Sequence, residues 1–218
     1  MSACCDSACH STPPPDHGYR RILWVALGIN AAMFAIELAT SFLAGSVAVQ
    51  ADALDFLGDA GNYAVSLLVL GMAVAWRARA ALLKGAVMGV FGLWVLFNTA
   101  SAAIAGTIPH AEIMGAIGFL ALAANVSVAF LLYRHRYDDA NRLSVWLCSR
   151  NDAIANIAVI LAGAGVWVSD TAWPDIAVAL AIAALGLTSA VRIVRVAVSE
   201  LRSGTTVGDR LSAQADRG

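Results

Sequence analysis

The chain has 218 residues, of which 60% are hydrophobic and only 13% are charged, and its mean hydropathy is +0.73. A soluble domain of this size does not have such a composition, and a formal net charge of −1 leaves no basic surface for a nucleic acid. We therefore expect an all-α membrane protein whose surroundings are membrane lipid.

Six apolar segments follow one another along the chain, separated by short breaks. Each is long enough to cross a hydrocarbon core of roughly 30 Å as a helix that rises about 1.5 Å per residue. The segments cover residues 22–44, 47–76, 82–106, 112–133, 143–168 and 174–198. The sequence thus predicts six transmembrane helices in one domain over residues 20–203, flanked by disordered tails at 1–19 and 204–218.

The basic residues gather on one side of these segments. Of the 14 Lys and Arg residues, all except Arg150 precede the first segment, lie between the second and third or the fourth and fifth, or lie at or beyond the end of the sixth. Lys84 belongs to the group between the second and third segments. Because basic loops stay in the cytoplasm, both termini are expected there. We expect a multi-pass protein of a plasma membrane, such as the bacterial inner membrane.

The N-terminal tail contains proline, which prevents a helix, and several soft metal ligands. These ligands lie within seven residues of one another but lack the CxxC spacing of zinc and copper motifs. Metal binding by the tail and an incidental set of thiols therefore both stay open. The candidate tail ligands are Cys4, Cys5, Cys9 and His10.

The second apolar segment carries three aspartates, Asp52, Asp55 and Asp59, at helical spacings that place them on one face. A carboxylate at membrane depth costs at least about 2.5 kcal/mol, so three within eight residues indicate a functional site. In the fifth segment, Cys148 and Asp152 form a second pair one helical turn apart.

The two pairs are predicted to meet near the middle of the membrane. Counted from the ends of their segments, Asp55 and Asp59 lie roughly 12–18 Å from one face, and Cys148 and Asp152 roughly 8–14 Å from the other. Four such ligands suit the tetrahedral preference of Zn²⁺, and the thiolate favours Zn²⁺, Cd²⁺ or Co²⁺, with Mn²⁺ and Fe²⁺ still open. Since metal binding forces protons off buried carboxyl and thiol groups, protons and metal are expected to compete here.

Other polar residues are candidates for supporting the ligands or for ion access. An alternative is that the acids pair with bases to hold the helices together, but Arg150 alone is available against five acids. Arg150 itself is expected either to reach the cytoplasmic face or to pair with Glu37. Amides inside the segments are typical of hydrogen bonds between helices. The candidates for support or access are Asp52, Glu37, Asn151 and Asn156.

Several motifs over residues 20–203 resemble the cation diffusion facilitator family. They are Asn30, Phe34, Glu37, Gly45-Ser46 and the run ADALDFLGD in the first two segments, Asn125 in the fourth, and CSRNDAIAN in the fifth. The resemblance implies a homodimeric antiporter that exports Zn²⁺ or a related ion in exchange for protons, with Asp55, Asp59, Cys148 and Asp152 as ligands. Cys148 stands where the family usually has His, and the family's C-terminal cytosolic domain is expected to be absent.

We therefore expect a secondary transporter that exports divalent transition-metal cations, without a resident cofactor. The alternative is a membrane metal sensor or accessory protein that binds metal without moving it. We do not expect an enzyme, because the sequence shows no nucleophile–base pair and no His inside an apolar segment.

Overall fold

The computed structural model describes residues 17–68, 74–133 and 140–215, without the side chains of some residues near helix ends, among them 140–148 and 203–215. The described residues form six α-helices and no strand, which confirms the all-α fold. The helices are α1 (His17–Ala44), α2 (Val47–Leu68), α3 (Val74–Ala105), α4 (Ala111–Tyr133), α5 (Ala140–Ser169) and α6 (Trp173–Ala215). The tail with Cys4, Cys5, Cys9 and His10 lies outside the described residues.

Five of the six helices are long and apolar enough to cross a membrane, namely α1, α3, α4, α5 and α6. This confirms a multi-pass integral membrane protein. Helix α2 is the exception among the described helices because its three aspartates reduce its hydropathy. Helix α6 continues past Ser203 to Ala215, so residues 204–215, assigned above to a disordered tail, are helical in the structure.

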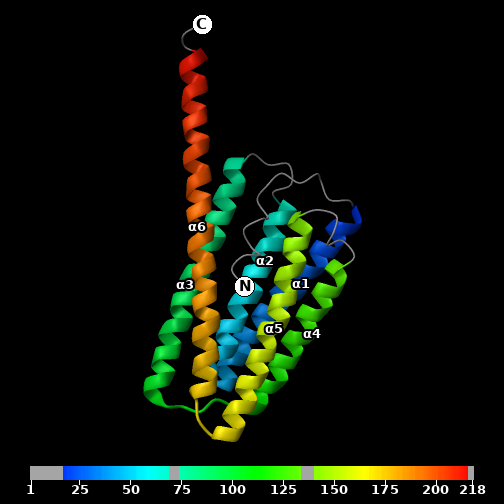
Figure 1. Ribbon diagram of the computed structural model, residues 1–218, viewed down its shortest axis with the longest axis vertical. Helices are drawn as coiled ribbons and strands as arrows, with labels where there is room; N and C mark the ends of the chain where they lie inside the picture. The colour runs from blue at the N-terminus through cyan, green and yellow to red at the C-terminus, as the bar shows by residue number, and fades with distance from the viewer. Residues whose placement is uncertain (1–16, 69–73, 134–139, 216–218) are drawn as a thin grey trace.

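The helices form an antiparallel bundle in which the start of α1 and the end of α6 lie on the same side (Figure 1). The most extensive packing joins α3 to α6, α4 to α5, and α1 to α2. Helix α2 contacts all five other helices. This central place surrounds the acidic segment of α2 with protein, which keeps its carboxyl groups away from lipid.

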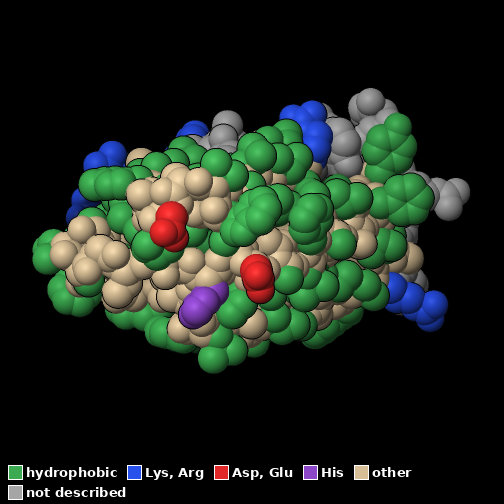
Figure 2. Space-filling view, turned by 90° about the horizontal axis from the view of Figure 1, so that it is seen from below, with side chains coloured by type: hydrophobic (Ala, Val, Ile, Leu, Met, Phe, Trp, Pro, Cys, Tyr) green, Lys and Arg blue, Asp and Glu red, His purple; other side chains and the backbone are tan. Residues whose placement is uncertain are grey.

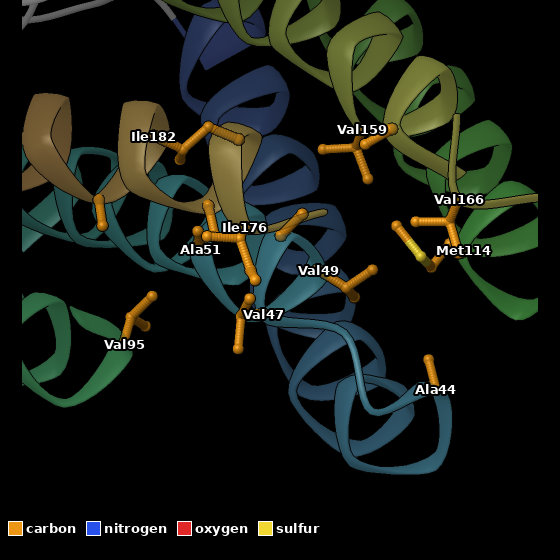
Figure 3. Close-up of a cluster of buried hydrophobic side chains, with 14 of the residues drawn as sticks. Ala44, Val47, Val49, Ala51, Val95, Met114, Val159, Val166, Ile176 and Ile182 are labelled. Atoms are coloured by element: carbon orange, nitrogen blue, oxygen red, sulfur yellow. The ribbon is translucent and has the colours of Figure 1, made fainter. Parts of the chain in front are cut away.

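A cluster of buried apolar side chains fills the end of the bundle opposite the start of α1 and the end of α6 (Figure 3). It joins the start of α2, with Val47, Val49 and Ala51, to side chains such as Val159 of α5 and Ile182 of α6. Burial of methyl-bearing side chains at this density fixes the register of the central helix. The polar half of α2 therefore lies at a defined height, next to α5 and α6.

The start of α2 is tied to α6 by Asp175. The Asp175 carboxylate accepts hydrogen bonds from the Ser46 hydroxyl at 2.6 Å, the Val47 amide at 2.9 Å and the Ala48 amide at 3.0 Å. These amides belong to the first turn of α2 and have no acceptor within their own helix. Gly45, with φ of 63°, makes the preceding turn from α1 possible. An α6 side chain thus caps α2.

Candidate functional site

A small cavity of about 40 Å³ lies between α2, α3, α5 and α6. Such a volume admits an ion or very few waters. Asp55 and Asp59 of α2 and Asp152 of α5 line it together, and the other polar residues of its wall are Lys84 of α3, Asn151 of α5 and Ser189 of α6. Three of the four predicted metal ligands therefore share one enclosed space.

The helical spacing of α2 explains why two of the aspartates share this wall, since residues four apart lie one above the other. Glycines let the neighbouring helices come close. A Cβ atom added at Gly58 would lie 2.9 Å from Met88 Cε, and one added at Gly186 would lie 2.5 Å from Leu54 Cδ2. Each of these glycines lines the cavity, so close helix packing defines its size.

Asp59 is held from the side of α5. The Tyr63 hydroxyl donates to Asp59 Oδ2 over 3.5 Å and also hydrogen-bonds the Ser149 hydroxyl at 3.0 Å. All three side chains are buried. This chain of hydroxyl groups links the two helices that carry the predicted ligands, next to Cys148 in the sequence.

The side chain of Cys148 lies outside the described part of the structure, although its backbone belongs to α5. Within the described residues, no three His, Cys, Asp or Glu side chains are arranged closely enough to hold a metal ion. The three carboxyl groups line one cavity without converging on one point. Four-ligand metal binding therefore stays a prediction.

A buried hydrogen-bonded chain crosses the bundle beside the cavity. Asn125 of α4 donates to Asn156 Oδ1 at 2.9 Å, and Asn156 of α5 donates to Asp52 Oδ2 at 2.7 Å. A second amide pair, Asn98 with Gln50, joins α3 to α2 at 2.9 Å. These are the interhelix hydrogen bonds that amides inside apolar segments predict.

Glu37 and Asp52 lie next to each other, and both are fully or almost fully buried. The carboxyl group of Glu37 hydrogen-bonds that of Asp52, so its partner is a second acid and not a base. Of the two expectations for Arg150, pairing with Glu37 is not what the structure shows: Arg150 is exposed and donates to the Asn151 side chain at 3.2 Å. Glu37 belongs to α1, a helix that contributes no residue to the cavity wall. Asn151 lines the cavity, whereas Glu37, Asp52 and Asn156 do not.

Sequence reasoning about the site misses the cavity residues of α3 and α6, among them Lys84 and Met88. Both come from α3, whose sequence has no ligand pattern. Lys84 was counted only among the basic residues of the cytoplasmic side. The sequence does contain a signal that could have placed Lys84 at the site. Lys84 lies inside the predicted span 82–106, and a charge within a span needs a polar neighbour.

The fold and the cavity together define a helical membrane protein that carries an acidic chamber among its helices. The family model described as the cation efflux transmembrane domain matches residues 23–202. The chain thus belongs to the cation efflux family, which is a family of metal-cation transporters rather than enzymes. This confirms the resemblance to cation diffusion facilitators. The comparison with curated proteins returned no match.

Proposed function

We propose that the protein exports a divalent transition-metal cation, with Zn²⁺, Cd²⁺ or Co²⁺ preferred, from the cytoplasm in exchange for protons. The observation that supports this most directly is the cavity in which Asp55, Asp59 and Asp152 meet from two helices. Both termini lie in the cytoplasm in this proposal, and a homodimer stays a prediction of the family resemblance.

The predicted ligand set accounts for the proposed choice of metal. Carboxylate oxygens alone would suit Mg²⁺ and Ca²⁺, whereas a thiolate shifts preference toward Zn²⁺, Cd²⁺ and Co²⁺. Cys148 precedes Asp152 by one turn of α5 and would supply that sulfur. We therefore expect the metal order to depend on residue 148.

Exchange for protons follows from the same ligands. Carboxyl and thiol groups enclosed among helices resist ionisation when no cation is present. A divalent ion that binds them must displace their protons, and its release on the other side lets protons return. The proposal predicts that a pH gradient drives metal flux and that metal binding weakens as pH falls.

The test is metal uptake into proteoliposomes under an imposed pH gradient, with Zn²⁺, Cd²⁺, Co²⁺ and Mn²⁺ compared in parallel. Asp59→Asn and Asp152→Asn should abolish gradient-driven flux because each removes a ligand charge at nearly constant shape. Cys148→His should keep flux but change the order of metals. Glu200→Gln, an acid of α6 that does not line the cavity, is the matched control and should behave as wild type.

Two results would contradict the proposal in different ways. Flux that survives in both Asn variants would show that the transported metal does not pass through the cavity. Tight metal binding that needs Asp59 and Asp152, without flux of any metal, would instead support the alternative function of a membrane metal sensor.

A further inference from the structure

Lys84 places a basic side chain at the wall of the acidic cavity. It is the one cationic side chain among the described residues that line this space, which also includes Asp55, Asp59 and Asp152. The side chain comes from α3 and is half-buried. A basic side chain therefore borders the space in which the proposed metal would bind.

The structure holds this side chain at two points. Its stem crosses α2 at Gly61, where an added Cβ atom would lie 3.1 Å from Lys84 Cδ, 3.2 Å from Cγ and 3.3 Å from Cε. Its ammonium group donates a hydrogen bond to Asn62 Oδ1. Asn62 follows Asp59 by three residues, so this amide lies about one turn of α2 away from the carboxylate. The glycine provides the groove, and the amide provides an acceptor outside the ligand set.

From this arrangement we propose that the Lys84 ammonium is a tethered cation that competes with the transported metal for the carboxylates of the cavity. This inference rests on the proposed function. Without metal, the ammonium partly compensates the acidic wall. When the metal binds, the two cations repel each other, and the Asn62 acceptor, which the ammonium already contacts, keeps the ammonium away from the metal.

The chemistry of lysine suits this role. Its charge is compact and sits on a flexible stem, so it can move by a few ångströms without disturbing the helix that carries it. Repulsion between like charges in a chamber with little water is much stronger than in bulk solvent. Lys84 is therefore expected to weaken metal binding and to speed metal release.

A purely structural role for Lys84 predicts the opposite sign. If the ammonium served only to hold α3 against α2, its removal would loosen the cavity and weaken metal binding. Competition predicts that removal of the charge tightens binding. The direction of the change in Kd therefore separates the two roles.

The experiment measures the Zn²⁺ Kd of the full-length protein in lipid nanodiscs by calorimetry. Lys84→Met, which keeps the stem and removes the charge, should lower the Kd by at least about tenfold. Lys84→Arg should stay much closer to wild type because it retains the charge. Arg79→Gln is the control: Arg79 lies on the same helix, is exposed and stacks 5.0 Å from the Trp76 ring centre, so its loss should leave the Kd unchanged.

A second variant tests the same idea without removal of the lysine. Asn62→Ala deletes the acceptor that holds the Lys84 ammonium away from the metal, so the Zn²⁺ Kd should rise severalfold. If Lys84→Met folds, an unchanged or raised Zn²⁺ Kd overturns the inference. If Lys84→Met does not fold, an unchanged Kd in Asn62→Ala overturns it. If the wild type binds no Zn²⁺, or if Asp152→Asn binds it equally well, the proposed function itself fails.

Discussion

Individual polar residues divide into two sets with different surroundings. Asp55, Asp59 and Asp152 face a cavity, while Asp52 is enclosed by protein and accepts a hydrogen bond from Asn156. A carboxylate inside a bundle is stable only when neighbouring groups compensate its charge. The three cavity-facing carboxylates can bind and release a cation, whereas Asp52 keeps its hydrogen bond to Asn156.

Asn156→Ala should therefore destabilise the bundle. The change leaves Asp52 Oδ2 and the Asn125 amide without the partner they share. We expect the free energy of unfolding to fall by about 1–2 kcal/mol, measured by denaturant titration in detergent micelles with circular dichroism. Asn98→Ala breaks a partly buried hydrogen bond and should cost less than half as much. Equal losses of stability in the two variants would show that the buried Asn125–Asn156–Asp52 hydrogen bonds stabilise the bundle no more than the partly buried pair does.

At the residue scale, three carboxyl groups that the sequence predicts to approach one another line one cavity, while their role as metal ligands stays a prediction. Helical spacing on α2 and the depth of Asp152 on α5 require only regular geometry and a membrane of known thickness. The same reasoning could not find Lys84, since its position in the cavity depends on how α3 packs against Gly61 of α2. Contacts between helices distant in sequence are set by side-chain shape, which spacing alone does not reveal.

At the scale of helices, glycines determine how closely α6 approaches α2. A Cβ atom at Gly186 would lie 2.5 Å from Leu54 Cδ2, whereas one at Gly28 of α1 would have no neighbour within 4 Å. The same residue type thus has a packing role at one position and none at the other. Sequence analysis could place each glycine in a segment but could not distinguish these two environments.

Gly186→Ala should force α6 away from α2 and should also distort the cavity that Gly186 lines. We expect a loss of about 1–3 kcal/mol in the free energy of unfolding, typical of overpacking, together with weaker Zn²⁺ binding. Gly28→Ala should leave stability unchanged or raise it slightly, because alanine favours the helix. The comparison is made by thermal unfolding of both variants in the same detergent. Equal stability of the two variants would contradict the close contact between Gly186 and Leu54.

At the scale of the whole molecule, the bundle has two chemically different ends. Figure 2 shows the end with the α1–α2, α3–α4 and α5–α6 connections, where acidic side chains and one histidine lie near the centre and Lys and Arg appear only toward the edges. Basic residues at the other end are those used above to predict orientation. The difference between the ends favours a cytoplasmic location for the end at which α1 begins and α6 ends.

Reporter fusions expressed in a bacterial host test this orientation and the crossing of α2. A fluorescent protein fused after Met72 or after Gly218 should be fluorescent, since it would stay in the cytoplasm. Alkaline phosphatase fused after Gly45 or Gly106 should be active, because it would be exported. Active phosphatase after Met72 would show that α2 does not cross the membrane, and the reverse pattern at all four sites would invert the topology.

The cap of α2 by Asp175 has a consequence for biosynthesis. The ribosome makes α2 long before α6, so the first turn of α2 must wait for an acceptor that lies 127 to 129 residues further along the chain. Asn156, the partner of Asp52, also arrives late. The helix with the three closely spaced aspartates thus reaches its final surroundings only after the last helix has been made. A chain cut short before residue 175 would carry α2 with its aspartates but without the cap that fixes it.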